Sequence, residues 1–143
     1  MFNTVVVPVD PGEPKFSAPA LEAASRFARD YGSRLRLVAV LAHSQGFVSS
    51  YLPPDFEEKA VADTRAMLDD LGHGLGLAKE QVSVSVRIGS IYHEVIEEAK
   101  EVGADLIVME SHRPDLSTYL LGSNAAKIVR HSTCSVMVLR QGA

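Results

Sequence analysis

The segment that decides the fold runs from Asp105 to Arg140 and has the sequence DLIVMESHRPDLSTYLLGSNAAKIVRHSTCSVMVLR. Its first apolar run, at 106–109, has no polar alternation, which is typical of a strand covered on both faces in a parallel sheet. The tripeptide at 122–124 opens a helical segment, and the apolar run at 135–139 predicts a second strand. This segment is therefore predicted to form strand, loop, short helix and strand.

The predicted helix start at Gly122, Ser123 and Asn124 has the chemistry of an anion-binding site. A glycine and a hydroxyl at a helix start leave backbone N–H groups available, and these add to the positive end of the helix dipole. In the preceding loop, His112 and Arg113 can supply further donors, and Arg113 adds positive charge. An ordinary N-capping serine after a polar turn explains the same residues. Spacing alone leaves both interpretations open.

This loop and helix start resemble those of the universal stress protein family. The resemblance is carried by SHRP at 111–114 and by TYLLGSNAA at 118–126, and it is strongest to the subgroup with this Ser-His-Arg-Pro loop. It extends over nearly the whole chain. Nucleotide-binding members share a pattern of glycine, two residues, glycine, nine residues, then glycine and serine or threonine. The chain keeps the last pair as Gly122 and Ser123.

Two positions of that pattern differ here, and the spacer is one residue shorter. Arg113 replaces the second glycine, as is normal in the subgroup, whereas Glu110 stands where a small residue is expected. A carboxylate about 4 Å from a phosphate opposes binding by about 1 kcal/mol in water, and by several times that in a sheltered site. Either Glu110 points away, or a cation bridges it, or the chain prefers AMP or binds no nucleotide.

Further apolar runs continue the alternation of strands and helices. The run TVVVPV at 4–9 predicts another buried parallel strand, and LRLVAVL at 35–41 predicts the next strand of the sheet. Residues 82–88 alternate apolar and polar side chains, which predicts an edge strand with one face in solvent. Amphipathic helices are predicted between the strands, within 17–31, 55–71 and 90–99.

Five strands alternating with four helices predict an α/β fold with one open parallel sheet and helices on both faces. This Rossmann-like arrangement is expected to form a single domain over residues 1–143. The family resemblance implies the strand order 3-2-1-4-5. That order brings Asp10, Val40 and the loop after Met109 to one edge of the sheet.

The resemblance implies that an adenine nucleotide binds at this edge, since ligands of doubly wound sheets bind where the strand order reverses. Asp10 is placed for a ribose hydroxyl or the adenine edge, although an aspartate is also common in such turns. Gly89 matches a family position near the nucleotide and is equally compatible with a turn. ATP is expected, with AMP or ADP possible, together with Mg²⁺ held through phosphates and water. The expected contacts are Pro8, Val9, Asp10, Val40, Gly89, Met109, Ser111, His112, Arg113, Gly122, Ser123, Asn124, Ser135 and Val136.

The length and composition of the chain narrow the possible functions and partners. The 143 residues suffice for one domain, and the formal net charge of −4 argues against general affinity for nucleic acid or anionic membranes. The single cysteine, Cys134, excludes an internal disulfide and is expected in the core. No metal-ligand spacing, transmembrane run or secretion signal is visible, so we expect a cytoplasmic protein without a protein-held metal.

The last predicted strand, 135–139, is apolar on both faces although the family topology puts it at a sheet edge. An apolar edge strand favours pairing with another chain, so a homodimer or higher homo-oligomer is expected through this strand.

Three functions remain open. The first is an ATP-binding stress-response regulator, in which the nucleotide orders the loop 111–121 and changes a surface for an unidentified protein partner. The second is a nucleotide-free dimeric adaptor, and the third is a slow ATPase. The sequence has neither a Gly-x-x-x-x-Gly-Lys phosphate loop nor a Gly-x-Ser-x-Gly elbow, and His112 has no evident partnered nucleophile. We therefore expect a binding protein with at most weak ATPase activity.

Overall fold

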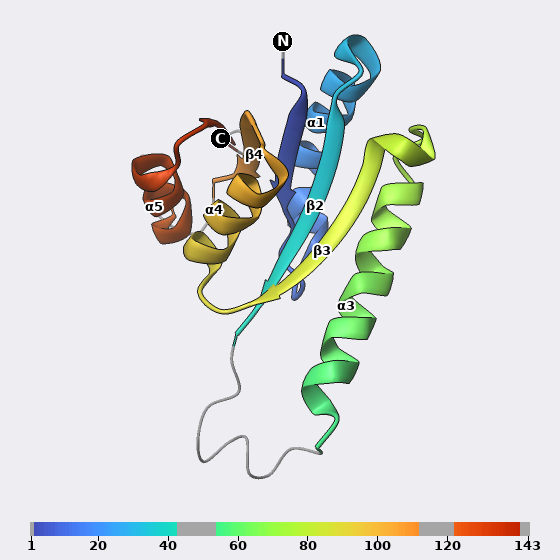
Figure 1. Cartoon of the computed structure of the whole chain (residues 1–143), viewed down its shortest axis with the longest axis vertical. Coiled ribbons are helices and arrows are strands. Elements are labelled where there is room, and N and C mark those ends of the chain that lie inside the picture. The colour runs from blue at the N-terminus through green and yellow to red at the C-terminus, as the bar shows by residue number, and fades with distance from the viewer. Residues whose placement is uncertain (1, 43–53, 112–121, 141–143) are drawn as a thin grey trace.

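A computed structural model describes residues 2–42, 54–111 and 122–140 of the chain. Its centre is a five-stranded parallel sheet in the order β3-β2-β1-β4-β5 (Figure 1). The strands are β1 (Thr4–Pro8), β2 (Arg34–Leu41), β3 (Val82–Ile88), β4 (Leu106–Glu110) and β5 (Ser135–Leu139). The predicted α/β class and the strand order 3-2-1-4-5 are both confirmed.

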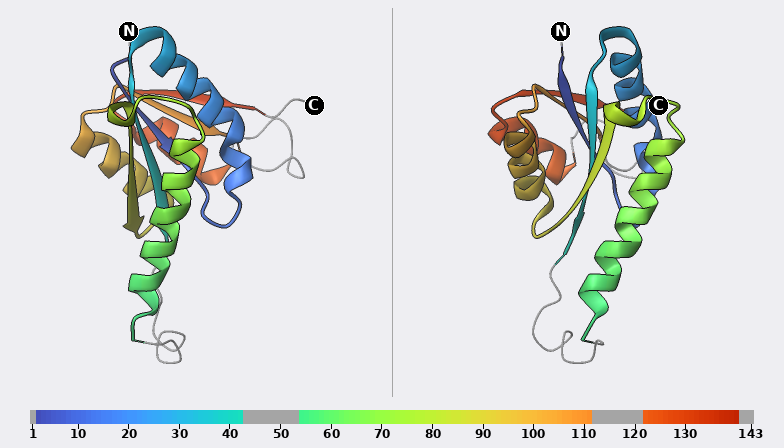
Figure 2. Two further views of the ribbon diagram at one scale, coloured as in Figure 1. Left: turned by 90° about the vertical axis from the view of Figure 1, so that its right-hand side faces the viewer. Right: turned by 45° about the vertical axis from the view of Figure 1, so that its right-hand side comes forward.

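Helices cover both faces of this sheet. In the right-hand view of Figure 2, α1 and α3 lie on one side of the strands, and α4 and α5 lie on the other. These helices are α1 (Ala18–Tyr31), α3 (Phe56–His73), α4 (Ile91–Val102) and α5 (Ser123–His131), with short 3-10 turns at Pro14–Ser17 and Lys79–Gln81. None of these helices has both the length and the apolar character needed to cross a membrane.

The side chains on the two faces of the central strands pack in two separate core layers. Leu37 of β2 packs in the layer under α1 and α3, whereas its neighbour Val38 packs in the layer under α4 and α5. The same alternation separates Val108 from Met109 in β4. Because successive side chains of a strand point to opposite faces, a strand buried on both faces must be apolar at every position. This explains the apolar runs at 5–7 in β1, 37–41 in β2 and 106–109 in β4.

Two connections at the carboxyl edge of the sheet, those after β1 and β3, begin with backbone hydrogen bonds to β2. Beyond Pro8, which has no N–H to donate, the N–H of Val9 still donates to the Val38 carbonyl over 2.8 Å. Beyond β3, the N–H of Gly89 donates to the Leu41 carbonyl over 2.9 Å. These bonds extend the strand pairing past the strand ends and fix the residues that follow.

Candidate functional site

A cleft of about 360 Å³ opens at the carboxyl edge of the sheet, where the chain order reverses between β1 and β4. Its volume lies in the range of small-molecule sites, and its place is where doubly wound folds bind ligands. The lining residues come from β1, β2 and β4, from the segment between β1 and α1, and from the starts of α4 and α5. They are Pro8, Val9, Asp10, Pro11, Phe16, Ser17, Val38, Val40, Ile91, Val95, Met109, Glu110, Ser123, Asn124 and Ala125.

One side of this cleft is an apolar wall formed by Val38, Val40, Ile91, Val95 and Met109. All of these except Ile91 are buried members of the core layer under α4 and α5, so the wall continues the hydrophobic core. Ile91, the first residue of α4, is 45% exposed. Aliphatic side chains of this kind favour a flat apolar ring and offer nothing to an isolated ion.

The start of α5 adds a polar end to the cleft. Gly122 caps this nine-residue helix and accepts a 2.9 Å hydrogen bond at its carbonyl from the N–H of Ala126. Ser123 and Asn124 line the cleft, and the first turn contains no acidic residue. Because the first N–H groups of a helix have no acceptor within the helix, this end of the cleft suits an anion.

Asp10 stands at the mouth of the cleft, in the loop after β1. Its Oδ1 accepts a 2.8 Å hydrogen bond from the N–H of Gly12, so the carboxylate has a defined position. A carboxylate has further lone pairs, which can accept from hydroxyl or amino groups of a ligand. The two interpretations of Asp10 from the sequence are thus compatible, because the residue both orders the turn and lines the cleft.

Glu110, the last residue of β4, also belongs to the cleft lining. Both of its carboxylate oxygens are buried. The strand alternation that puts Met109 against α4 and α5 directs Glu110 to the other face of the sheet, towards the side of Phe16 and Ser17. A carboxyl group is therefore built into the cleft surroundings, on the face of the sheet away from the apolar wall.

The structure brings together half of the residues expected to contact a nucleotide. Those that line the cleft are Pro8, Val9, Asp10, Val40, Met109, Ser123 and Asn124. Gly122 adjoins them as the N-cap of α5. Ser111 lies just beyond β4 and is not in the lining; its N–H donates to the Leu139 carbonyl over 2.7 Å. The expected contacts of His112 and Arg113, and the loop through residue 121, lie outside the described residues.

Three of the residues expected to contact the nucleotide lie outside the cleft lining. Ser135 pairs with Leu106 at the beginning of β4, and Val136 pairs with the next residue, so both belong to the amino-terminal half of the sheet. Gly89 has a φ of 149°, and a Cβ atom there would lie 2.8 Å from Oε2 of Glu94. The positive φ and the nearby Glu94 carboxylate are enough to explain why this position is a glycine. A contact with a nucleotide is not needed to explain it.

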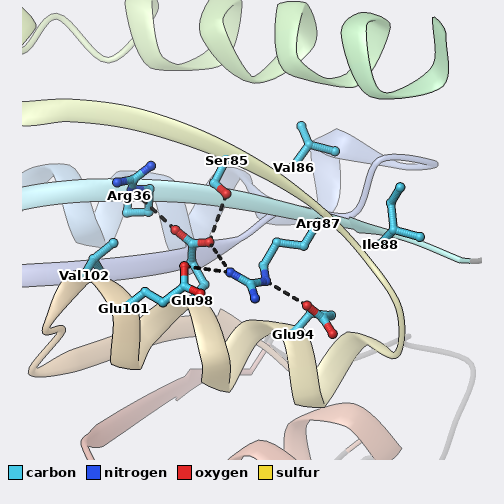
Figure 3. Close-up of a pocket in the computed structure, with 9 residues that line it drawn as sticks. All are labelled: Arg36, Ser85, Val86, Arg87, Ile88, Glu94, Glu98, Glu101 and Val102. Atoms are coloured by element: carbon cyan, nitrogen blue, oxygen red, sulfur yellow. Dashed lines mark hydrogen bonds and ion pairs between the residues drawn. The ribbon is translucent and has the colours of Figure 1, made fainter. Parts of the chain in front are cut away.

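A second hollow, of about 510 Å³, lies between β3 and α4 and is strongly polar (Figure 3). Arg87 reaches from β3 to three acidic side chains of α4, with Nε to Glu94 at 2.8 Å and Nη1 to Glu98 and Glu101 at 3.0 and 3.1 Å. Glu98 also accepts from the Ser85 hydroxyl at 2.9 Å and forms a 3.6 Å ion pair with Arg36. We call these six residues the Arg87 network.

The Arg87 network corrects the expectation that the polar face of β3 is in solvent. β3 is an edge strand as predicted, yet Arg87 is only 20% exposed, and Glu98 only 4%, at the side chain. Hydrogen bonding to Glu94, reinforced by Glu98 and Glu101, raises the pKa of Arg87 above its ordinary value despite partial burial. Arg87 therefore stays charged, and α4 is fixed to the edge of the sheet.

Across the part of the chain that the structure describes, no cluster of three or more His, Cys, Asp or Glu is placed to hold a metal ion.

Sequence reasoning missed the contribution of α4 to the cleft. Ile91 and Val95 are spaced by four residues on one face of an amphipathic helix, which is the pattern of an ordinary core stripe. Only the position of Ile91 at the first turn, directly after the third strand, signals that it reaches the carboxyl edge. Phe16 and Ser17 were missed because the turn after β1 gave no periodic signal.

Comparison with solved structures identifies the same architecture elsewhere. A hypothetical protein solved in order to assign its biochemical function superposes with a TM-score of 0.82 at 19% identity, covering 100% of this chain and 99% of that chain. A universal stress protein in complex with cAMP superposes with a TM-score of 0.71 at 22% identity, covering 99% of both chains.

Sequence comparison gives the family. Universal stress protein G of Escherichia coli O157:H7 is 34% identical over 143 residues, covering 98% of this chain and 100% of that relative. The model of the Universal stress protein family matches residues 1–140. With this match over nearly its full length, the chain belongs to the universal stress protein family.

Proposed function

We propose that the cleft binds an adenine nucleotide, with the base against the apolar wall and the phosphates at the start of α5. The observation that carries this proposal is the convergence of the apolar wall, the Asp10 carboxylate and a helix N-terminus on one cleft. Each of these matches one part of a nucleotide: an aromatic base, a hydroxylated sugar and an anionic tail. The complex of a universal stress protein with cAMP supports the proposal, because the same fold holds an adenine nucleotide there.

ATP is the proposed nucleotide, with ADP and AMP as alternatives, and Mg²⁺ accompanies the polyphosphate. The buried Glu110 carboxylate adds a negative charge near a ligand that is itself an anion. Mg²⁺ neutralises phosphate charge and binds mostly through phosphate oxygens and water, so it needs no cage of protein ligands. The repulsion by Glu110 falls with each phosphate charge that the cation neutralises.

The proposed role is regulation by binding and not catalysis, with at most weak ATP hydrolysis. A nucleotide-dependent change of surface would reach a protein partner in the cytoplasm as part of a stress response, as the family membership suggests. A nucleotide-free adaptor is the second candidate, and Glu110 favours it because its charge opposes phosphates. The likeness of residues 111–114 and 122–124 to one subgroup of the family stays a prediction.

Calorimetric titration of the purified protein with Mg-ATP and with AMP tests this proposal. We expect binding by the wild type, and a loss of about tenfold to a hundredfold in affinity for Asp10→Ala, because a hydrogen bond to a charged acceptor contributes about 1.5–3 kcal/mol. The matched control is Glu13→Ala, which removes an exposed carboxylate three residues away and outside the cleft lining.

Two results would count against the nucleotide cleft. The absence of binding by the wild type removes it and leaves the nucleotide-free adaptor. Equal losses for Asp10→Ala and Glu13→Ala would mean that general surface charge, and not the cleft, determines affinity. Repeating the ATP titration without Mg²⁺ tests the cation, since we expect weaker binding there.

We also propose that the chain forms a homodimer through β5. This strand lies at the edge of the sheet, and its apolar residues from Val136 to Leu139 are only half-buried. An apolar strand edge with unpaired backbone groups favours pairing with a second copy. Light scattering at micromolar concentration is expected to give twice the 15.4 kDa mass of the chain, and a monomer mass would contradict the proposal.

A further inference from the structure

We propose that Glu94 is a positioning residue for the nucleotide cleft, and that its bond to Arg87 sets ligand affinity by fixing the first turn of α4. This inference rests on the proposed nucleotide-binding function. It assigns a role in binding to the contact between Glu94 and Arg87, neither of which lines the cleft.

The helix α4 presents different faces to the two hollows. Ile91 and Val95 belong to the apolar wall of the cleft, whereas Glu94, Glu98 and Glu101 face β3 in the polar hollow. Figure 3 shows Arg87 extending from β3 towards the three glutamates, while Val86 and Ile88 point to the other side of the sheet. The polar face of α4 is therefore bound to β3, and its apolar face lines the cleft in which the ligand is proposed to bind.

Among the three glutamates, Glu94 is the one attached to the turn that matters for the cleft. It lies three residues after Ile91 and next to Val95, and its Oε1 accepts the 2.8 Å bond from Nε of Arg87. Glu101 binds the same guanidinium at 3.1 Å, but from the far end of the helix. Loss of Glu94 should thus release the cleft-lining turn, and loss of Glu101 should not.

The connection between β3 and α4 is short and lies against Glu94, so the position of Glu94 affects the position of the first turn of α4. Only Gly89 and Ser90 separate the strand from the helix. The Glu94 carboxylate lies so close to Gly89 that a Cβ atom there would meet Oε2 at 2.8 Å. The N–H of Glu94 also donates to the Ser90 carbonyl over 3.0 Å. The glutamate is thus in contact with both ends of the connection whose course determines where Ile91 lies.

Ile91 depends on this positioning more than the rest of the wall does. Val38, Val40, Val95 and Met109 are buried in the core layer and are fixed by their own packing, whereas Ile91 is 45% exposed. Its place over a bound base follows from where the first turn of α4 sits. A displacement that removes apolar contact equal to one buried methylene group weakens binding about fourfold.

The test compares two variants of the same helix by calorimetric titration with adenosine and with AMP, at a temperature where circular dichroism shows each variant folded. We expect Glu94→Ala to weaken both ligands about fourfold or more and by the same factor, since the wall contacts the shared base. Glu101→Ala removes another acceptor of the same guanidinium and is expected to leave both affinities at the wild-type value. Glu94→Gln keeps the shape of the side chain and is expected to lie between the two.

The outcomes separate this inference from the function on which it rests. If the wild type binds neither ligand, the proposed function fails and the inference with it. If the wild type binds, the positioning role is wrong in either of two cases: both Glu94 variants keep wild-type affinity, or both lose no more affinity than Glu101→Ala. The nucleotide cleft stands in both cases. A purely structural role would lower the unfolding temperature of the variants without this difference in affinity. Should Glu94→Ala not fold, Glu94→Gln against a matching Glu101→Gln decides by the same criterion.

Discussion

Replacement of Arg87 by methionine is expected to lower the free energy of unfolding by about 3 kcal/mol, because it leaves buried charge without its main partner. Methionine keeps the apolar stem of the side chain but removes the guanidinium that binds Glu94, Glu98 and Glu101. Glu98, with a side chain only 4% exposed, would retain the Ser85 hydroxyl and the more distant Arg36. Urea denaturation followed by circular dichroism measures the change as a shift of the midpoint at constant slope.

The matched control is Arg26→Met, which makes the same chemical change at an exposed ion pair. Arg26 and Glu22 are separated by 3.8 Å on one helix face, with side chains 73% and 70% exposed. Such pairs contribute little, so the change in unfolding free energy should stay within about 0.5 kcal/mol. If the two variants lose equal stability, the Arg87 network is no more than a surface ion pair.

The α/β class was predictable because its decisive signals are local, whereas the strand order was implied by the family resemblance. The apolar runs at 5–7 in β1 and at 106–109 in β4 contain no polar residue, and only a strand covered on both faces requires that pattern. The alternation in β3 correctly indicated an edge. What the sequence could not show is which partner covers the polar face of β3, because the pairing of Arg87 with Glu94 joins a strand to a helix and depends on tertiary placement.

A signal for that pairing was nevertheless present. Glu94, Glu98 and Glu101 recur at spacings of four and three, which places them on one helix face. An acidic helical stripe following a strand with arginine on its polar face is the pattern to look for. Taken alone, such a stripe is also typical of a helix face in solvent, so the strand and the helix must be considered together.

The site was predictable to the extent that topology determines it. Asp10, Val40 and Met109 end strands or follow them, so the switch in strand order brings them together whatever the details of packing. The same principle places Ser135 away from the carboxyl edge, because this residue begins a parallel strand. Ile91 could not be distinguished from a core residue without knowing how far α4 extends over the cleft.

Leu37→Ala should cost about 3 kcal/mol of unfolding free energy and leave nucleotide affinity unchanged. Leu37 is fully buried in the layer under α1 and α3, where its Cδ1 lies 3.9 Å from the position of a Cβ atom at Gly72. Loss of a buried leucine side chain combines the transfer free energy with the cavity left behind, and such variants lose about 2–5 kcal/mol. Denaturation gives the stability and calorimetry with AMP gives the affinity.

Two comparisons make the Leu37 result specific. Leu75→Ala makes the same change at a half-buried position of the same layer and should cost clearly less. Val38→Ala lies one residue along β2 but faces the cleft, so it should cost less stability than Leu37→Ala and still weaken AMP. Weaker AMP binding by Leu37→Ala with normal binding by Val38→Ala would mean that the ligand lies on the α1 and α3 side of the sheet. The cleft, the apolar wall and the role assigned to α4 would then all be wrong together.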